Sequence, residues 1–277
     1  MSMISRRRFA LKMLVGSLAL SWFPAFAAKK KKAPPAPVCH LTAEQEEGPF
    51  YIQGEPLRSN LVEDREGTPL TLRVQLLDMP HCTPLKNASL EIWSCDAMGE
   101  YSGFDSAHMG PPPDGMGPPP NGMPMPPHGD PGDLGDHSGR PDGPPHHEPD
   151  NQKTFLRGRQ NTDDQGRIEF ATLYPGCYEG RVNHIHLRVR LNESDRIVYT
   201  GQLFFPETVT DVVMSLPPYS AHRIRRTRAA EDMVFTNQHG ASSLMEIEAA
   251  QPGVIGKGFI GTASLGIDTS KGVSKPA

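Results

Sequence analysis

Alternating apolar and polar positions predict a chain built mainly from β-strands. In residues 184–191 the odd positions are apolar, whereas the even positions hold His184, His186, Arg188 and Arg190. This period of two is typical of a strand with one face toward a core. Similar runs, bounded by turn residues, occupy 70–78, 89–95, 167–173 and 197–205. No long segment has the helical period, so we predict an all-β fold arranged as a β-sandwich.

The first 37 residues have a different pattern and predict a targeting segment. Ser5-Arg6-Arg7-Arg8-Phe9 is followed by the apolar run 13–20 and by Ala25-Phe26-Ala27, a small-x-small cleavage site. We therefore expect residues 1–27 to be a twin-arginine signal peptide recognised by the Tat export machinery. Cleavage near Ala27 would give a periplasmic or secreted product, and an uncleaved amphipathic anchor is the alternative. The apolar run is too short for a stable membrane span.

The rest of the chain divides by composition. Residues 28–37 are basic and proline-rich, as expected of a solvated linker. Residues 38–262 form the expected catalytic domain, within which 253–261 predicts an edge strand, and 263–277 form a C-terminal tail. Residues 106–150 are dominated by Pro and Gly with scattered His and Met, so we expect a disordered insertion in the sandwich. It is a spacer, a lid, a partner-binding arm or a collector of metal ions.

Charge and cysteine content narrow the class of protein. Loss of the four positive charges in residues 1–27 would lower the formal net charge from −4 to −8, which argues against nucleic acid as a partner. Four cysteines in a periplasmic protein permit disulfides, and their spacing is not that of a zinc site. We expect one disulfide among Cys39, Cys82 and Cys95, with the pairing open, and Cys177 as a packing residue.

The two histidines of the 184–191 strand are the first candidates for chemistry. Residues two apart in a strand lie about 7 Å apart on the same side, so one metal ion can take both imidazoles. The alternative is a pair of hydrogen-bonded histidines on a polar face. Tyr101 and Tyr178 each follow a predicted strand and a glycine-containing turn. A phenol becomes a good ligand at neutral pH only beside a strong Lewis acid such as ferric iron.

Together these segments resemble the intradiol ring-cleavage dioxygenases, which include catechol 1,2-dioxygenase and protocatechuate 3,4-dioxygenase. The resemblance follows the family's order over most of residues 38–240. It is carried by Glu47-Gly48-Pro49-Phe50-Tyr51, Glu91-Ile92-Trp93, Gly99-Glu100-Tyr101-Ser102, Phe155 to Asp163, Pro175 to Arg181, His184-Ile185-His186 and Gln202-Leu203-Phe204-Phe205.

The resemblance implies a β-sandwich of the intradiol dioxygenase type and an Fe(III) cofactor ligated by Tyr101, Tyr178, His184 and His186. Tyr178 would be the axial ligand that leaves when substrate arrives. Arg181 would face the substrate, and Gln202 would lie beside its ring. The implied reaction uses O₂ to cleave a catechol between its hydroxyl-bearing carbons, giving a muconate-type diacid.

Two further hypotheses stand beside the enzyme. One is a secreted β-sandwich that binds ligands or sequesters metal without turnover. The other is a zinc hydrolase on His184 and His186, which lacks a third ligand at a convincing spacing. The sequence does not single out one catechol, and a homo-oligomer is compatible with it.

Overall fold

The computed structural model describes residues 39–79, 81–105 and 148–271. The chain divides into two units, Met1–Pro37 and Val38–Ala277, and the described residues all belong to the second. The predicted signal peptide and linker therefore lie outside the described residues, as does the insertion up to residue 147. No helix among the described residues is long and apolar enough to span a membrane.

The described part of the chain is mostly β-structure with a few short helices. The strands are β1 (Pro69–Asp78), β2 (Thr83–Pro84), β3 (Ala88–Trp93), β4 (Arg157–Asn161), β5 (Arg167–Leu173), β6 (His184–Leu191), β7 (Arg196–Phe204), β8 (Glu246–Ala249) and β9 (Phe259–Ile267). The helices are α1 (Glu207–Met214) and α2 (Met233–Asn237), with 3-10 turns η2 (Tyr219–Ala221), η3 (Gly240–Ser243) and η4 (Ile255–Lys257).

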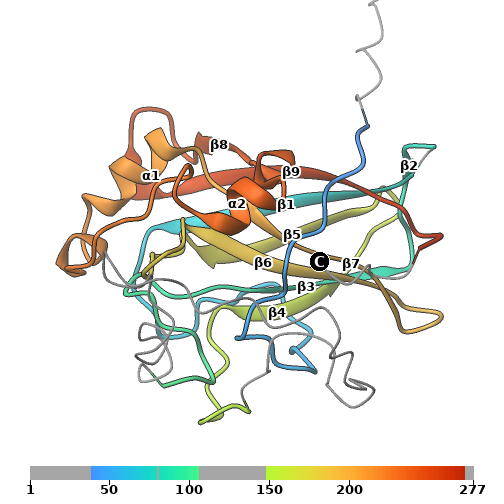
Figure 1. The fold of residues 1–277 in the computed structure, drawn as a ribbon, viewed down its shortest axis with the longest axis horizontal. Helices are drawn as coiled ribbons and strands as arrows, with labels where there is room; N and C mark the ends of the chain where they lie inside the picture. The colour runs from blue at the N-terminus through green and yellow to red at the C-terminus, as the bar shows by residue number, and fades with distance from the viewer. Residues whose placement is uncertain (1–38, 80, 106–147, 272–277) are drawn as a thin grey trace, which may run out of the picture. The chain divides into compact units, whose positions relative to one another are not determined.

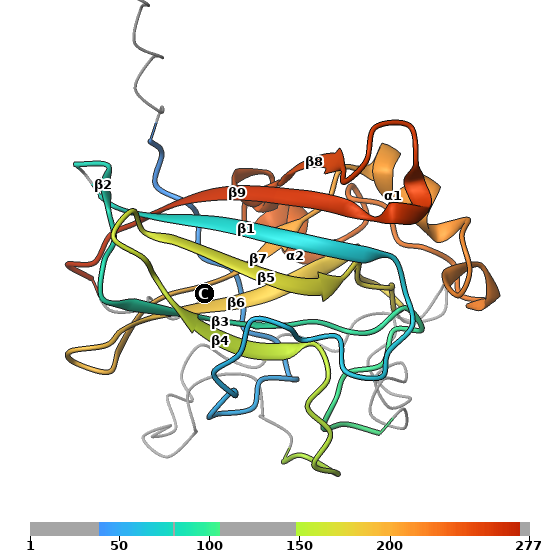
Figure 2. The same cartoon turned by 180° about the vertical axis from the view of Figure 1, so that it is seen from behind.

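The strands form two sheets that face each other (Figure 1). One sheet has the order β2-β1-β9-β8, with β5 also paired to β1, and the other has the order β4-β3-β6-β7. Figure 2 shows β9, β1 and β5 running side by side in the first sheet. The pairing of β1 with β9 is parallel, and the pairings between the other named strands are antiparallel.

The core lies between the two sheets, as the alternation predicts. On β6 the side chains of Ile185, Leu187 and Val189 are at most 1% exposed, and they belong to one cluster with Leu72 and Leu265 of the opposite sheet. The five predicted strands correspond to β1, β3, β5, β6 and β7. The prediction of an all-β sandwich is confirmed.

The C-terminal part of the prediction is wrong. β9 is not an edge strand, because it pairs with β1 on one side and with β8 on the other. It continues to Ile267, so the tail expected from residue 263 begins inside a strand. Ala263, Leu265 and Ile267 are buried on the core side, but the glycines between Phe259 and Ile267 weaken the alternation that would have marked the strand.

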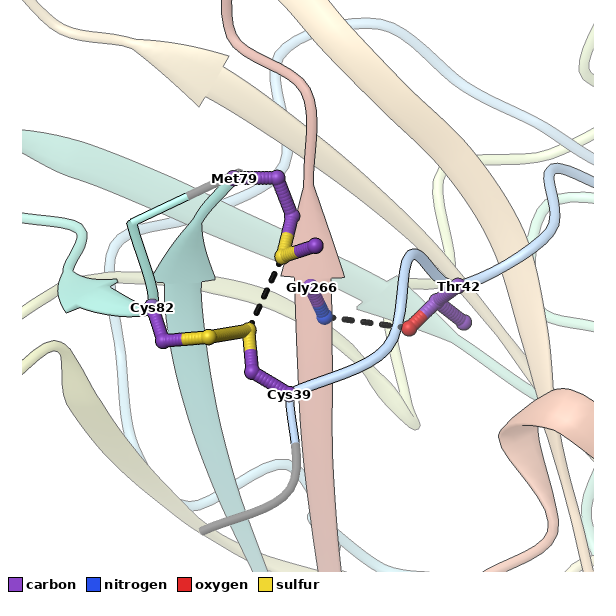
Figure 3. The surroundings of a disulfide bond; sticks show 5 residues. All are labelled: Cys39, Thr42, Met79, Cys82 and Gly266. Carbon is purple, nitrogen blue, oxygen red and sulfur yellow. Dashed lines mark hydrogen bonds between the residues drawn. A yellow bond between two sulfur atoms is a disulfide. The ribbon is translucent and has the colours of Figure 1, made fainter. Parts of the chain in front are cut away.

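A disulfide anchors the segment that leads to the site. Cys39 bonds to Cys82, beside Met79 (Figure 3). Cys95 and Cys177 are free and buried. The expectation of one disulfide drawn from the first three cysteines is therefore confirmed. Just after Cys39, Thr42 exchanges hydrogen bonds with Gly266 of β9 at 2.9 and 3.0 Å. The chain after residue 39, blue in Figure 1, then crosses the four-stranded sheet.

Candidate metal centre

One row of side chains crosses all four strands of the β4-β3-β6-β7 sheet on the face opposite the core. His186 of β6 lies opposite Trp93 of β3 and Gln202 of β7, and Trp93 lies opposite Arg157 of β4. His184 is on the same face, one pleat repeat along β6. The four side chains of the row are at most 1% exposed. A sheet face that alternation alone would assign to solvent is thus a buried polar layer.

The two tyrosines reach this layer from loops that Asp96 holds together. Its carboxylate accepts hydrogen bonds from the backbone of the turn before Tyr101, including Glu100 N at 3.0 Å. Its carbonyl accepts one from Gly176 N at 2.9 Å, in the turn before Tyr178. A β-carbon on Gly176 would lie 2.5 Å from that carbonyl oxygen, so only glycine permits this approach.

The four side chains predicted to be ligands come together. The hydroxyl oxygens of Tyr101 and Tyr178 lie 3.4 and 3.3 Å from Nε2 of His184, and Nε2 of His186 lies 3.0 Å from the same atom. Nδ1 of His184 is 2.6 Å from the carbonyl oxygen of Val182. Because this carbonyl can only accept, Nδ1 carries the hydrogen and the lone pair of Nε2 points to the other three groups.

Burial keeps all four groups neutral when no metal ion is bound. It raises the pKa of Tyr178 to about 12 and raises the pKa of Tyr101 well above its ordinary value. Burial, followed by the charge of Arg181, lowers the pKa of His184, and burial also lowers that of His186. Neutral imidazoles are ready to coordinate, whereas the phenols need a cation that stabilises their anions.

The donor set fits a strongly Lewis-acidic metal ion. The donor atoms are separated by distances expected between neighbouring ligands of one metal ion. Among the described residues there is no group of three or more His, Cys, Asp or Glu that could hold a metal. A metal held here would therefore need Tyr101 and Tyr178 beside the two histidines, which suits ferric iron better than zinc. The zinc hydrolase hypothesis gains no third ligand from these residues.

Aromatic rings and one glycine shape the immediate surroundings. Phe50 stacks on Tyr101 with ring centroids 4.4 Å apart, and Trp93 stacks on His186 at 5.1 Å and 3°. Gly48 has a φ of +75°, and a β-carbon there would lie 3.0 Å from Cε1 of His186. The segment Glu47–Tyr51 thus packs directly on two of the predicted ligands.

Arg181 and Gln202, the two predicted substrate-facing residues, contact each other. Nη2 of Arg181 donates to Oε1 of Gln202, and Nε donates to Asp232 at 3.1 Å. The carboxylate of Asp232 is fully buried, while the Arg181 side chain is 14% exposed. Arg181 and Asp232 thus form a largely buried ion pair. Asp232 was not among the predicted site residues, although an Asp before a short helix is a recognisable N-cap signal.

A second buried ion pair, also absent from the predicted site, supports Tyr101. Arg157 donates to the hydroxyl and carbonyl oxygens of Ser102, both at 2.8 Å, and to Glu55 at 3.2 Å. Both charged side chains are 2% exposed. Burial raises the pKa of Glu55 to about 7, and the charge of Arg157 opposes that rise. The pair joins the residue after Tyr101 to the loop that carries Phe50.

Comparison with known proteins identifies the class. No family model and no curated protein sequence matches the chain. Among solved structures, an intradiol ring-cleavage dioxygenase from Tetranychus urticae is 32% identical, with a TM-score of 0.67 over 85% of this chain and 98% of that one. A second dioxygenase is also 32% identical, with a TM-score of 0.66 over 85% and 97% of the two chains.

A more distant match extends the likeness in fold. The dioxygenase domain of a carbohydrate-binding fusion protein from Streptomyces sp. SirexAA-E is 22% identical, with a TM-score of 0.50 over 83% of this chain and 99% of that one. On the 32% identity over nearly the whole length of the Tetranychus urticae protein, the chain belongs to the intradiol ring-cleavage dioxygenase family.

Proposed function

We propose that the protein is an Fe(III)-dependent intradiol dioxygenase that uses O₂ to cleave a catechol-type ring between its two hydroxyl-bearing carbons. The product would be a muconate-type diacid. The observation that carries the proposal is the convergence of two phenols and two neutral imidazoles on one buried point. The names of the 32% identical proteins, which are dioxygenases, support it.

Tyr101, Tyr178, His184 and His186 would hold the iron. The ferric ion would stabilise the two phenolates and withdraw electron density from a bound catecholate, which makes the ring reactive toward O₂. Tyr101 is buried beneath Phe50, whereas Tyr178 is partly exposed. Tyr178 is therefore the ligand that can move aside. Burial raises the pKa of Tyr178, so its phenolate, once released, would be a suitable base to accept a proton from the catechol.

Arg181 supplies a positive charge beside the proposed metal ion. Its guanidinium is largely buried and is held through Nε by Asp232 and through Nη2 by Gln202. A cation held beside the reacting ring stabilises negative charge as it develops, in the manner of an oxyanion hole. Loss of Arg181 is therefore expected to lower kcat much more than the iron content.

The test combines colour with oxygen uptake. Purified, iron-loaded protein should be red-brown from phenolate-to-iron charge transfer and should consume O₂ with catechol or a related diol from a substrate panel. Chelation of the iron should abolish both signals, and Fe(III) should restore them. Colourless, iron-free protein after expression with ample iron would favour the alternative, a binding or metal-sequestering β-sandwich without turnover.

A matched pair of variants tests the ligand assignment. Tyr178→Phe should lose the colour and the turnover. Tyr199→Phe removes another buried hydroxyl, which donates to the carbonyl oxygen of Ala43 at 2.8 Å and is not part of the donor cluster. This variant should keep the colour and the turnover. Full iron loading and full activity in Tyr178→Phe would disprove the assignment.

We also propose export by the twin-arginine route. The Ser5–Phe9 motif supports it, and a Cys39–Cys82 disulfide is compatible with an oxidising compartment. In a bacterial host the wild-type chain should be cleaved near Ala27 and recovered from the periplasm. Replacing Arg6 and Arg7 with lysine should leave it uncleaved in the cytoplasm, and equal export of both chains would contradict the proposal.

A further inference from the structure

The short helix α2 begins at a carboxylate that also reaches the site. Asp232 is the N-cap residue of α2, and its Oδ1 accepts hydrogen bonds from Val234 N at 2.8 Å and Phe235 N at 3.1 Å. Its Oδ2 points the other way and accepts Nε of Arg181 at 3.1 Å and Val182 N at 2.9 Å. Only the first two bonds are needed for a helix cap.

The second oxygen of Asp232 acts on two parts of the metal centre at once. Besides holding Arg181, it binds the N–H of Val182, whose carbonyl oxygen receives Nδ1 of His184 at 2.6 Å. A partner on the distal ring nitrogen sets the tautomer and the orientation of a metal-ligating histidine. Asp232 therefore holds Val182, which in turn orients the ring of His184, although Asp232 lies 50 positions from Val182 in the sequence.

The other end of α2 is also joined to the site. Gln238, the C-cap residue, accepts Glu46 N on its Oε1 at 2.7 Å and Nε2 of Gln45 on its backbone carbonyl at 3.2 Å. Gln202 in turn donates through Nε2 to Glu46 O at 2.9 Å and through its backbone N–H to Oε1 of Gln45 at 2.9 Å. The segment that carries Gln45 and Glu46 is thus held between Gln202 and α2.

These contacts close a ring. Arg181 donates hydrogen bonds to Asp232 and to Gln202. Gln202 donates to the carbonyl oxygen of Glu46, and the Glu46 N–H donates to Gln238. Asp232 and Gln238 are the two ends of helix α2, so the ring is complete. Arg181 uses two of its five N–H donors in the ring, so it can be held without losing all of its capacity to face a substrate. Donors that are positioned before reaction are the ones that stabilise a transition state best.

We propose that Asp232 and Gln238 are positioning residues, through which helix α2 holds the guanidinium of Arg181 and the amide of Gln202 in place at the metal centre. This inference rests on the proposed dioxygenase function. Asp232 acts on Arg181 and on Val182, the residue whose carbonyl oxygen contacts His184. The side chain of Gln238 acts on Gln202 indirectly, through Glu46, and therefore has the weaker effect.

The variants are Asp232→Asn and Gln238→Met, with Thr236→Val as control. An asparagine can still cap α2 through its oxygen, but its amide nitrogen would face two other donors. Thr236 is exposed and donates to the carbonyl oxygen of Asp232 at 2.9 Å, within α2, so its loss weakens the helix without breaking the ring. Gln238 is only partly buried, so Gln238→Met should fold even if Asp232→Asn does not.

Three measurements separate positioning from stability. In metal-free protein, the Val182 amide of Asp232→Asn should exchange with D₂O at least about tenfold faster than in wild type, with the amides of β6 unchanged. In iron-loaded protein, its charge-transfer band should shift and kcat with catechol should fall about 10²-fold. Gln238→Met should lose about three- to tenfold in kcat with wild-type iron content. Thr236→Val should change Tm alone.

Specific outcomes overturn each idea separately. Wild-type kcat and absorption in Gln238→Met, together with unchanged Val182 exchange in Asp232→Asn, would overturn the positioning roles. An equal loss of kcat in Thr236→Val would do the same, because the effect would then be helix stability. A wild-type protein that stays colourless and consumes no O₂ would overturn the proposed function, and Val182 exchange would then decide the role of Asp232 in holding this peptide.

Discussion

The two faces of strand β6 are equally buried but do different things. Ile185, Leu187 and Val189 face the other sheet and are at most 1% exposed, while His184 and His186 on the opposite face are at most 2% exposed. The first face is covered by apolar side chains of a second sheet, and the other by loops and the segment after Cys39. Burial therefore does not distinguish the core from the candidate metal centre. The two differ in the kind of side chain that is buried, which is apolar in the core and polar in the candidate site.

The two faces also obey different energetic rules. An apolar side chain gains free energy wherever water is excluded, and needs no particular partner. A buried polar side chain is unfavourable unless each of its groups is satisfied. The polar face meets this demand only in part: Arg157 donates to Glu55, yet Nδ1 of His186 and Nε1 of Trp93 have no hydrogen-bond partner among the described residues. The unpartnered atoms therefore lower the stability that burial of this face would otherwise provide.

The largest effect is expected from His186→Leu, on the polar face. Removing one of four ligands should abolish the charge-transfer colour and lower turnover by about 10³-fold or more, because several kcal/mol of metal-derived stabilisation are lost. The free energy of unfolding of the metal-free protein should change by less than about 1 kcal/mol, since leucine removes an unpartnered polar atom. Iron analysis and urea unfolding measure both. If the variant does not fold, His186 is needed for stability as well, and the two faces of β6 do not differ in the way proposed.

Its neighbour Leu187 gives the reciprocal experiment. Leu187→Ala leaves a cavity in a fully buried apolar cluster and should lower the free energy of unfolding by about 2–5 kcal/mol. Iron content and kcat of the folded fraction should stay within about twofold of wild type. Val189→Ala, on the same face, is a matched control that should have a smaller effect on stability. A loss of iron in either variant would show that the faces are coupled.

The two faces of β6 were predictable from the sequence, whereas several contacts of the site were not. The period of two in residues 184–191 predicts both faces of β6, because side-chain direction in a strand is a local property. That Tyr101 and Tyr178 meet this strand came only from the family resemblance, since loop geometry depends on contacts such as those of Asp96. Asp232 was missed because its partner Arg181 is 51 positions away and nothing local marks the pairing. β9 was misplaced because glycines interrupt its apolar alternation.

A smaller effect, and one that depends on pH, is expected at Glu55 beneath the polar face. Burial raises its pKa from an ordinary value near 4.3 to about 7, so between these values the folded protein holds a proton that the unfolded chain has released. The free energy of unfolding should therefore fall as pH rises from about 4.5 to about 7, by on the order of 2 kcal/mol.

In Glu55→Gln the side chain at position 55 cannot titrate, so the free energy of unfolding should not show this fall with rising pH. The difference between wild type and variant, measured by urea unfolding of metal-free protein across this range, isolates Glu55 from other titrating groups. Glu169→Gln alters an exposed ion pair and should follow the wild-type pH dependence. If Glu55→Gln shows the full wild-type slope, the Arg157–Glu55 pair is ionised throughout and the polar face is better satisfied than we infer.

The smallest effect tests how closely the covering segment is fitted to the metal centre. Gly48 and Gly54 both have a positive φ, of +75° and +90°, so alanine at either position should lower the free energy of unfolding by about 1 kcal/mol. They differ in surroundings: a β-carbon on Gly48 would lie 3.0 Å from Cε1 of His186, whereas one on Gly54 would have nothing within 4 Å. Only Gly48→Ala should therefore displace the imidazole, shift the charge-transfer band and lower iron retention. If the two variants have the same spectrum, the segment that carries Gly48 can shift to accommodate a methyl group. The positions of the ligands would then be set by strand β6 and the two tyrosine loops alone.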